Sequence, residues 1–328
     1  MGCLSRGIFD FHVALGKNRG IRQEITPLAP PNRLTTLPGR KRLLSTICLG
    51  VHVSIAGKLS HAVDRAKSLH CGTMQIFSRN PRGWNTGPLD SSEIELFRKG
   101  REKARISPLI IHASYLINLA ATEDTLFERS ILALEEELQR GDQLGADYLV
   151  VHVGSNAQQG TGFGIARVVE ALGRMKTGTA RTQLLLENTA GERGDIGCRM
   201  DELAGILTQL GNNAWIGLCL DTCHAFAAGY DISHRAGVKA WVKEIKETVG
   251  VDRIKLLHIN DSKKGLNCHV DRHEHIGKGK IGLEGFRAII RHPELQRIPM
   301  ILETPKEQEQ DDRRNLETLM RLWGPVRK

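Results

Sequence analysis

The sequence predicts an α/β fold: a (β/α)8 or TIM barrel with a metal cluster at the C-terminal ends of its strands. Two observations lead to this prediction. Short apolar runs alternate with helical stretches through residues 47–303, and this alternation is typical of strand–helix units around a parallel sheet. Six of the runs end in a single His, Asp or Glu, and TIM barrels place their active sites at this end of the strands. The two observations rest on different residues and support each other.

Eight apolar runs are predicted to be the strands, with ends 25 to 45 residues apart. Eight strand–helix units in this length match the TIM barrel, which typically needs about 250 residues. The predicted strands are 47–53, 73–77, 108–112, 148–152, 184–187, 216–221, 254–259 and 299–303.

Helical patterns lie between these runs. Ser92-Glu93-Ile94-Glu95 has the form of a capping box and predicts a helix that starts with Ser92 as its cap. Another pattern stops at Gly72 and consists of Leu59, Ala62, Val63, Ala66 and Leu69. A longer one, with acidic residues on its other face, contains Phe127, Ile131, Leu134 and Leu138.

The composition is that of an ordinary globular protein, with 40% hydrophobic and 25% charged residues in a chain of 328. No apolar run reaches the roughly 18 residues that cross a bilayer, so no membrane partner is expected. The seven cysteines show no paired framework, which fits reduced thiols in a cytosolic compartment. We therefore expect a cytoplasmic protein.

The net charge of +9 is unevenly spread. Residues 1–46 carry eight Lys/Arg and two Asp/Glu, so +6 lies there and +3 remains for the other 282 residues. This segment also holds four prolines and the basic run Arg40-Lys41-Arg42. We expect a disordered basic extension or an overextended start at 1–46, with organelle targeting as an alternative, followed by one catalytic domain at 47–328.

The six strand-end residues are the first candidate metal ligands. A buried strand favours apolar residues, so a polar residue in the same place on six strands indicates another role. Three His and three carboxylates suit zinc, with manganese or iron as alternatives, and two ions sharing a carboxylate would use all six. They are His112, His152, Glu187, Asp221, His258 and Glu303, with His52 as a weaker seventh.

Three more candidates follow the strand ends. His224 lies three residues after Asp221, and Asp271 and His273 are spaced so that extended chain turns both side chains to one face. Together they could form a third site. Thiolate ligation by Cys219 and Cys223 is the competing idea, but Cys219 should point into the barrel wall or core, and structural roles are expected for both.

Longer motifs then resemble one known family. They include stretches 50–54, 77–84, 112–119 and 187–191, and above all DTCHAFAAGYD at 221–231 and VDRH at 270–273. From about residue 47 to 305 the chain is similar to endonuclease IV, the zinc-dependent apurinic/apyrimidinic endonucleases of base-excision repair. Departures are small: Gly57-Lys58, Val153 after His152, and an altered loop at 192–195, which leaves local DNA contacts open.

The resemblance implies three Zn²⁺ ions, with Mn²⁺ as an alternative at one or more sites. The first would bind His112, His152 and Glu187; the second would share Glu187 and add Asp221, His258 and Glu303; the third would bind His224, Asp271 and His273. It implies a monomeric hydrolase of the deoxyribonuclease IV type that cuts duplex DNA 5′ to abasic sites and leaves a 3′-hydroxyl and a 5′-deoxyribose phosphate. Glu187 is the expected catalytic residue, because it would fix the metal pair and help orient the attacking water.

The resemblance also makes Arg82, Tyr115 and Leu116 the candidates that probe the duplex. Two alternatives remain: a divalent-metal sugar isomerase, which would need only two metals, and a non-catalytic DNA-binding relative, which should have lost ligands. Basic residues near the strand ends are candidate phosphate contacts, namely Arg79, Lys263, Lys264, Lys278 and Lys280.

Overall fold

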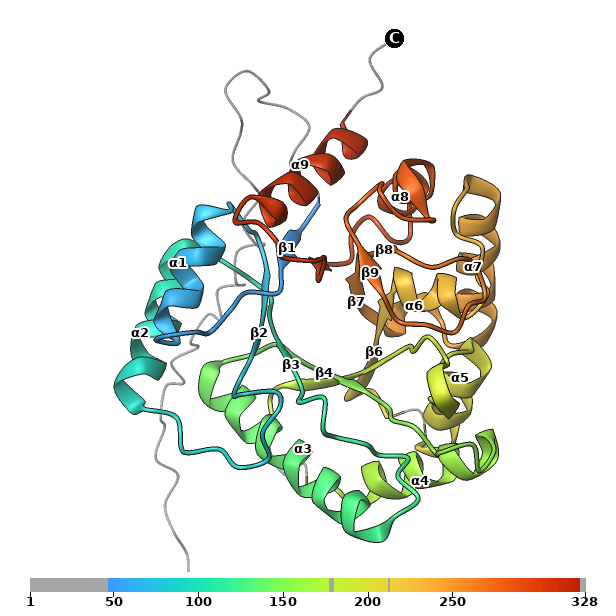
Figure 1. Cartoon of the computed structure of the whole chain (residues 1–328). Helices are drawn as coiled ribbons and strands as arrows, with labels where there is room; N and C mark the ends of the chain where they lie inside the picture. Colours follow the sequence, from blue (N-terminus) through green and yellow to red (C-terminus); the bar gives the residue numbers. More distant parts are fainter. Residues whose placement is uncertain (1–46, 177–179, 212, 325–328) are drawn as a thin grey trace, which may run out of the picture. The chain divides into compact units, whose positions relative to one another are not determined.

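A ring of parallel strands surrounded by helices forms the described part of the chain (Figure 1). The structure is a computed structural model that describes residues 47–176, 180–211 and 213–324. The basic extension expected at residues 1–46 lies outside the described residues. The predicted TIM barrel is confirmed.

Within the described residues, eight strands pair in parallel in the order β1-β10-β7-β6-β5-β4-β3-β2. All eight predicted strands are confirmed, some with ends shifted by one or two residues. They are β1 (Leu49–Val51), β2 (Met74–Phe77), β3 (Leu109–His112), β4 (Tyr148–His152), β5 (Gln183–Glu187), β6 (Ile216–Asp221), β7 (Ile254–His258) and β10 (Met300–Leu302). A short antiparallel pair, β8 (Asp261–Ser262) and β9 (His273–Glu274), follows β7.

The ring closes between β1 and β2. The Val53 N–H donates to the carbonyl oxygen of Gln75 at 2.7 Å, and the Gly72 N–H donates to that of Leu49 at 2.9 Å. Gly50 permits this approach, because a Cβ there would lie 1.9 Å from the carbonyl oxygen of Thr73. A side chain at residue 50 would therefore force the two strands apart.

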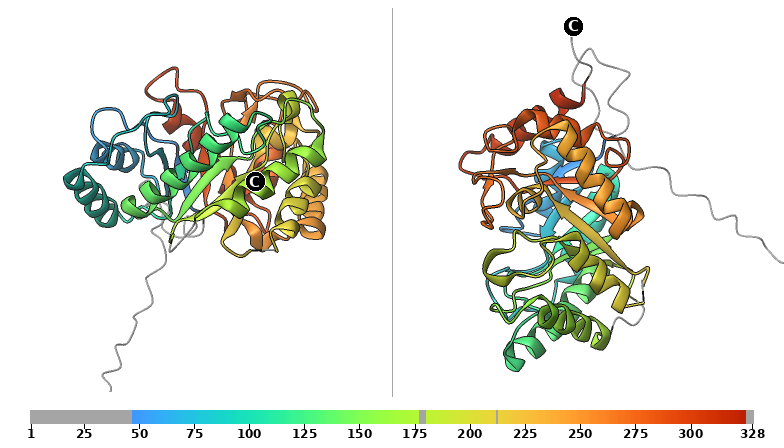
Figure 2. Two further views of the ribbon diagram at one scale, coloured as in Figure 1. Left: turned by 90° about the horizontal axis from the view of Figure 1, so that it is seen from below. Right: turned by 90° about the vertical axis from the view of Figure 1, so that its right-hand side faces the viewer.

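Helices surround the strands in all three ribbon views (Figures 1 and 2). The helices predicted around 59–69 and 127–138 are confirmed as α1 and α3. The described helices are α1 (Ser60–Ser68), α2 (Ser91–Ala104), α3 (Asp124–Leu144), α4 (Thr161–Arg174), α5 (Met200–Gln209), α6 (Thr222–Ala227), α7 (Arg235–Thr248), α8 (Gly282–Ile290) and α9 (Asp311–Trp323), with short 3₁₀ turns η1 (Glu192–Gly194) and η2 (Val251–Arg253).

The predicted cap of α2 was wrong. Asp90, two residues before Ser92, is the N-cap, and its carboxylate accepts the N–H groups of Ser92 and Glu93. Glu93, in the first turn of α2, contacts the start of α1. Its carboxylate accepts hydrogen bonds from the Ser60 N–H at 3.2 Å and from the Ser60 hydroxyl at 3.0 Å. Ser92 fits the local capping pattern, but the carboxylate of Asp90 accepts two free N–H groups of the first turn, which makes Asp90 the N-cap.

The strand alternation sets the chemistry of the barrel interior. Because successive side chains point to opposite faces, every second residue of a strand lies inside. An apolar floor results, and each of its members precedes a candidate ligand by two residues. The floor consists of Ile110, Val150, Leu185, Cys219, Leu256 and Ile301. The candidate ligands therefore form the next inward layer, directly above the floor.

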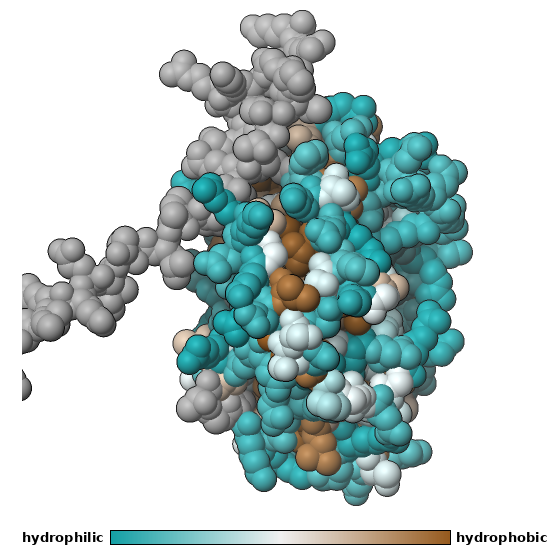
Figure 3. Space-filling view, turned by 90° about the vertical axis from the view of Figure 1, so that its left-hand side faces the viewer, coloured by the Kyte–Doolittle hydropathy of each residue, from teal (hydrophilic) through white to brown (hydrophobic). Residues whose placement is uncertain are grey.

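One side of the outer surface is mainly polar. The side that carries α1 and α2 is predominantly hydrophilic, with smaller hydrophobic areas among the polar residues (Figure 3). Among the described helices, none is both long enough and apolar enough for a membrane crossing.

Candidate metal centre

Nine candidate ligands converge at one end of the barrel. The structure places their ligand atoms in three groups, and within each group these atoms lie within 4.8 Å of one another. The groups are His112, His152 and Glu187; Glu187, Asp221, His258 and Glu303; and His224, Asp271 and His273. Some of these side chains line a cavity of about 440 Å³ that opens at this end, and Glu187, Asp221 and His258 lie fully buried beneath it.

Glu187 lies between the first two groups. Its Oε2 is 3.3 Å from His112 Nε2 and 3.1 Å from His152 Nε2, whereas its Oε1 is 2.8 Å from His258 Nδ1. Burial raises the pKa of Glu187, but the nearby His258 and His152 outweigh this and hold it well below the usual range. The side chain is thus a carboxylate, and each of its oxygens faces a different group.

The second group surrounds His258. Its Nδ1 is 3.2 Å from Glu303 Oε2 and 4.0 Å from Asp221 Oδ2. Burial lowers the pKa of His258, but the Glu303 and Glu187 carboxylates raise it above the ordinary value. Asn260 supports the group, because its side-chain N–H donates to Asp221 Oδ2 and its Oδ1 accepts the N–H of Glu303.

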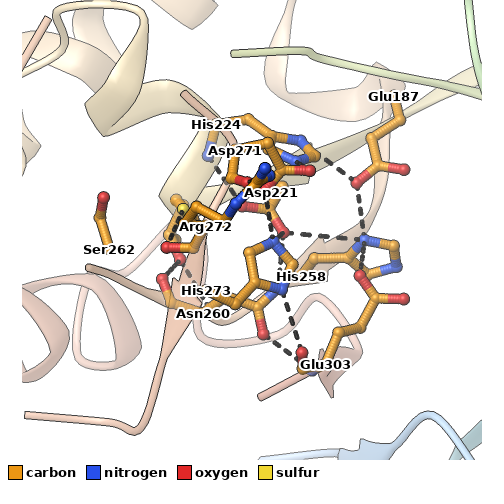
Figure 4. A network of polar contacts seen from close by, with 12 residues as sticks. Glu187, Asp221, His224, His258, Asn260, Ser262, Asp271, Arg272, His273 and Glu303 are labelled. Carbon is orange, nitrogen blue, oxygen red and sulfur yellow. Dashed lines mark hydrogen bonds and ion pairs between the residues drawn. The ribbon is translucent and has the colours of Figure 1, made fainter. Parts of the chain in front are cut away.

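The third group forms where α6 meets β9 and the loop before it (Figure 4). Asp271 lies between two rings, with 3.2 Å from Oδ2 to His224 Nε2 and 3.2 Å from Oδ1 to His273 Nε2. Asp221 places His224, because its carboxylate caps α6 and accepts the His224 N–H at 2.9 Å. Pairing of β8 with β9 sets Ser262 opposite His273 and so returns the loop over the strand ends.

Three of the histidines are held in one and the same way. In each, Nδ1–H donates to a main-chain carbonyl: His112 to Ala113 at 2.8 Å, His224 to Asn188 at 2.8 Å and His273 to Glu303 at 3.0 Å. Each ring therefore turns Nε2 toward the carboxylates. Metal-binding histidines are commonly fixed by a hydrogen bond from the other ring nitrogen.

The donor set fits divalent cations. His273 Nε2 is buried and makes no well-aligned hydrogen bond among the described residues, although Asp271 Oδ1 lies 3.2 Å away. Burial lowers the pKa of His273, but the Asp221 and Asp271 carboxylates outweigh this and raise it to about 9. Imidazole nitrogens and carboxylate oxygens in groups of three and four are ligands that zinc accepts. Closely packed buried carboxylates need compensating positive charge, which bound cations would provide.

Gln75 and Asn260 also belong to this centre, and the sequence analysis missed both. Gln75 lies 2.8 Å from His258 Nε2 and 2.6 Å from Glu303 Oε1. Its one signal in the sequence is a polar residue inside the apolar strand Met74–Phe77. Asn260 lies two residues after His258, just as each strand-end ligand lies two residues after a residue of the apolar floor. His52, the weaker candidate, contacts Glu303 at 3.2 Å beside this network.

The cysteines lie next to the ligand groups. Cys219 belongs to the apolar floor and falls near Glu187 and His258, and Cys223 falls near Asp221 and His273. Burial raises the pKa of Cys219 well above its ordinary value and that of Cys223 to about 12. Both side chains are therefore protonated thiols at neutral pH, which favours the structural roles expected for them.

The candidate duplex probes stand at the rim. Tyr115 lines the cavity, is 62% exposed and meets the Phe77 ring edge-on at a centroid distance of 5.3 Å. Leu116 follows it, half-buried, and Arg82 is exposed. Burial raises the pKa of Tyr115 to about 12, and the charge of Arg82 opposes this rise. The Ser114 hydroxyl donates to the carbonyl of Pro81 at 2.8 Å and joins their loops.

One predicted phosphate contact was wrong. Arg79 is buried, and it pairs with Glu137 at 2.8 Å and Glu136 at 3.1 Å, so its charge is already compensated inside the protein. The four lysines of that prediction are exposed. In the altered loop, the Glu192 carboxylate accepts the N–H of Asp271 at 3.4 Å, so this loop touches the third group.

Comparisons with known proteins place the chain in a family. A family model described as the xylose isomerase-like TIM barrel matches residues 63–323. A protein of Halothermothrix orenii named probable endonuclease 4 is 45% identical over 277 residues, which cover 83% of this chain and 99% of the relative. The crystal structure of endonuclease IV from Thermus thermophilus superposes with a TM-score of 0.75 at 37% identity, covering 84% of this chain and 98% of that one.

A sugar-modifying enzyme shares only the fold. The structure of a 3-keto-D-glucoside 4-epimerase from E. coli has a TM-score of 0.61 but 11% identity, over 84% of this chain and 98% of that chain. Coverage is similar in both cases, so sequence identity distinguishes the two groups: 45% and 37% for the two endonucleases against 11% for the epimerase. The chain belongs to the endonuclease IV family of xylose isomerase-like TIM barrels.

Proposed function

We propose that this chain is a DNA-repair endonuclease that hydrolyses the phosphodiester 5′ to abasic sites in duplex DNA, leaving a 3′-hydroxyl and a 5′-deoxyribose phosphate. The observation that carries the proposal is the arrangement of nine ligands in three groups, two of which share Glu187. Relatives named endonuclease 4 support the reaction class. The protein would act as a monomer.

The three groups would hold three zinc ions, with manganese as an alternative at one or more of them. When bound, such ions supply charge neutralisation of the phosphodiester and acidify water. Glu187 would be the catalytic residue, because its two oxygens face the first and second groups and would fix the separation of two ions. His112, His224 and His273 present Nε2 from rings already fixed by main-chain carbonyls, so little ordering remains on binding.

Recognition of damage would take place at the cavity rim. An abasic nucleotide has already lost its stacking and pairing, so it costs less to extrude from the duplex. Tyr115 and Leu116, with Arg82 beside them, would insert where the base is missing, because apolar or planar side chains can wedge between base steps. The exposed Lys263, Lys264, Lys278 and Lys280 would contact phosphates and position the duplex without reading its sequence.

The sugar isomerase alternative accounts for fewer residues. It would use two metals and gives no role to the group of His224, Asp271 and His273. It also gives no role to an exposed aromatic side chain at the cavity mouth.

A labelled duplex with one abasic site tests the proposal. Purified protein should cut on the 5′ side of the site, leave the matched intact duplex uncut, lose activity after chelation and regain it with zinc. Product mobility before and after phosphatase treatment would identify the 3′-hydroxyl end. Protein that holds zinc but cuts neither duplex would reject the proposed reaction.

A further inference from the structure

Gln75 interrupts the apolar floor of the barrel. It lies beside Ile110 in the register of β2 and β3, and its side chain is fully buried. The floor residues of six other strands are apolar. A buried amide is costly unless its hydrogen bonds are made, so the partners of Gln75 indicate why an amide is present.

The side-chain hydrogen bonds of Gln75 reach two members of the ligand layer and His52 beside it. Its Oε1 lies 2.8 Å from His258 Nε2. Its Nε2 donates to Glu303 Oε1 at 2.6 Å and lies 2.9 Å from His52 Nδ1. One amide thus contacts two of the four members of the second ligand group, from a strand that carries none of the nine candidate ligands.

The chemistry of these partners fixes the amide's orientation. A carboxylate only accepts hydrogen bonds, so the NH₂ group of Gln75 must face Glu303. The carbonyl oxygen then faces His258, and Nε2 of that ring must carry a hydrogen. In a neutral ring the lone pair therefore lies on Nδ1, which faces Glu187 at 2.8 Å and Glu303 at 3.2 Å.

We propose that Gln75 is a positioning residue of the metal centre, which selects the Nε2–H form of His258 and orients Glu303 for the second metal ion. This inference rests on the proposed function and deepens it. Hydrogen-bond partners of metal ligands fix the ring and the tautomer, and their loss commonly lowers metal affinity or activity about 10- to 100-fold.

The variant Gln75→Met tests this role, because it keeps a side chain of similar length without the amide. Titration of metal-free protein against a competing chelating dye should show affinity for one zinc ion lowered by about 10- to 100-fold. Ile110→Val is the matched control: it trims the neighbouring floor residue, removes no hydrogen bond and should bind zinc as the parent protein does. An equal loss of zinc affinity in the two variants would mean that Gln75 acts only by filling space in the floor, and it would overturn the proposal.

A second measurement reads the ring directly. In ¹⁵N-histidine-labelled protein, the Nε2–H of His258, assigned with His258→Gln, should exchange slowly with solvent and should lose this protection in Gln75→Met. Gln75→Glu keeps an oxygen that can accept this hydrogen, so the slowly exchanging signal should remain. It also places a second carboxylate next to Glu303, so its zinc affinity should be lower than that of the parent protein. Unchanged affinity and signal in Gln75→Met would overturn the inference. This signal can be measured without metal. If the parent protein binds no zinc, the proposed metal centre is refuted, but the hydrogen bond between Gln75 and His258 can still be tested separately.

Discussion

At the scale of single residues, Glu187 is the carboxylate on which two ligand groups depend. Glu187→Gln replaces one charge with an amide whose NH₂ group cannot serve as a ligand. We expect cleavage of the abasic duplex to fall to background, because two metal ions would lose their shared ligand. Cleavage under single-turnover conditions, with zinc content measured on the same sample, checks this.

The control for Glu187→Gln is a glutamate outside the centre. Glu170 is partly exposed on α4 and pairs with Arg167 and Arg174, so Glu170→Gln should leave cleavage unchanged. Exposed ion pairs contribute about 0–1 kcal/mol, so its folding should change little. Parent-level cleavage by Glu187→Gln would remove Glu187 from its catalytic role.

Tyr115 allows recognition to be separated from metal binding. Its ring packs edge-on against Phe77 and yet is 62% exposed, which is an arrangement suited to insertion into a duplex. Tyr115→Ala should weaken binding of the abasic duplex by roughly 5- to 150-fold, since an aromatic stacking contact is worth about 1–3 kcal/mol. Zinc content should not change, and Tyr115→Phe should bind like the parent protein. Equal affinity of Tyr115→Ala for the abasic duplex would assign the ring to loop packing.

At the scale of elements, a buried ion-pair network ties the loop after β2 to α3. Arg79 donates to Glu137 at 2.8 Å, and the Ser78 hydroxyl donates to the same carboxylate at 2.5 Å. Arg79→Leu should lower the free energy of unfolding by about 3–5 kcal/mol, because it leaves Glu137 as an unpaired buried charge. The double change Arg79→Leu/Glu137→Leu should recover part of that loss. Urea denaturation measures both, and an additive double variant would mean that the two residues do not depend on each other.

The elements also show what local sequence can predict. The strands could be predicted because each is a continuous apolar run, and the strand-end candidates because one polar residue closes the run, as in Ile110-Ile111-His112. Arg79 could not be placed, because its partner Glu137 lies 58 residues away and a basic residue near a strand end looks the same whether it is paired or free. Gln75 was conspicuous inside its strand, but its partners His258 and Glu303 are 183 and 228 residues distant.

At the scale of the whole molecule, the metal centre connects most of the barrel. Its ligands come from β3 to β7, from the residue after β10, from α6, and from β9 with the loop before it. Ions that bind there would add cross-links between strands that already meet through backbone pairing, the apolar floor and the surrounding hydrophobic core. Because an unfolded chain cannot present these ligands together, metal binding would add directly to folding stability.

Metal removal should therefore lower the melting temperature of the parent protein. An ion present at about 100 times its Kd adds about 2.7 kcal/mol, and about 1 kcal/mol corresponds to roughly 2–4 °C in a domain of this size. We expect a fall of at least about 5 °C after chelation, reversed by zinc, in differential scanning fluorimetry. Glu187→Gln should show a smaller zinc-dependent shift, because two of the three groups lose a shared ligand. A melting temperature that does not respond to chelation, in protein that contained zinc beforehand, would mean that the ions are not held by the nine residues that join the strands.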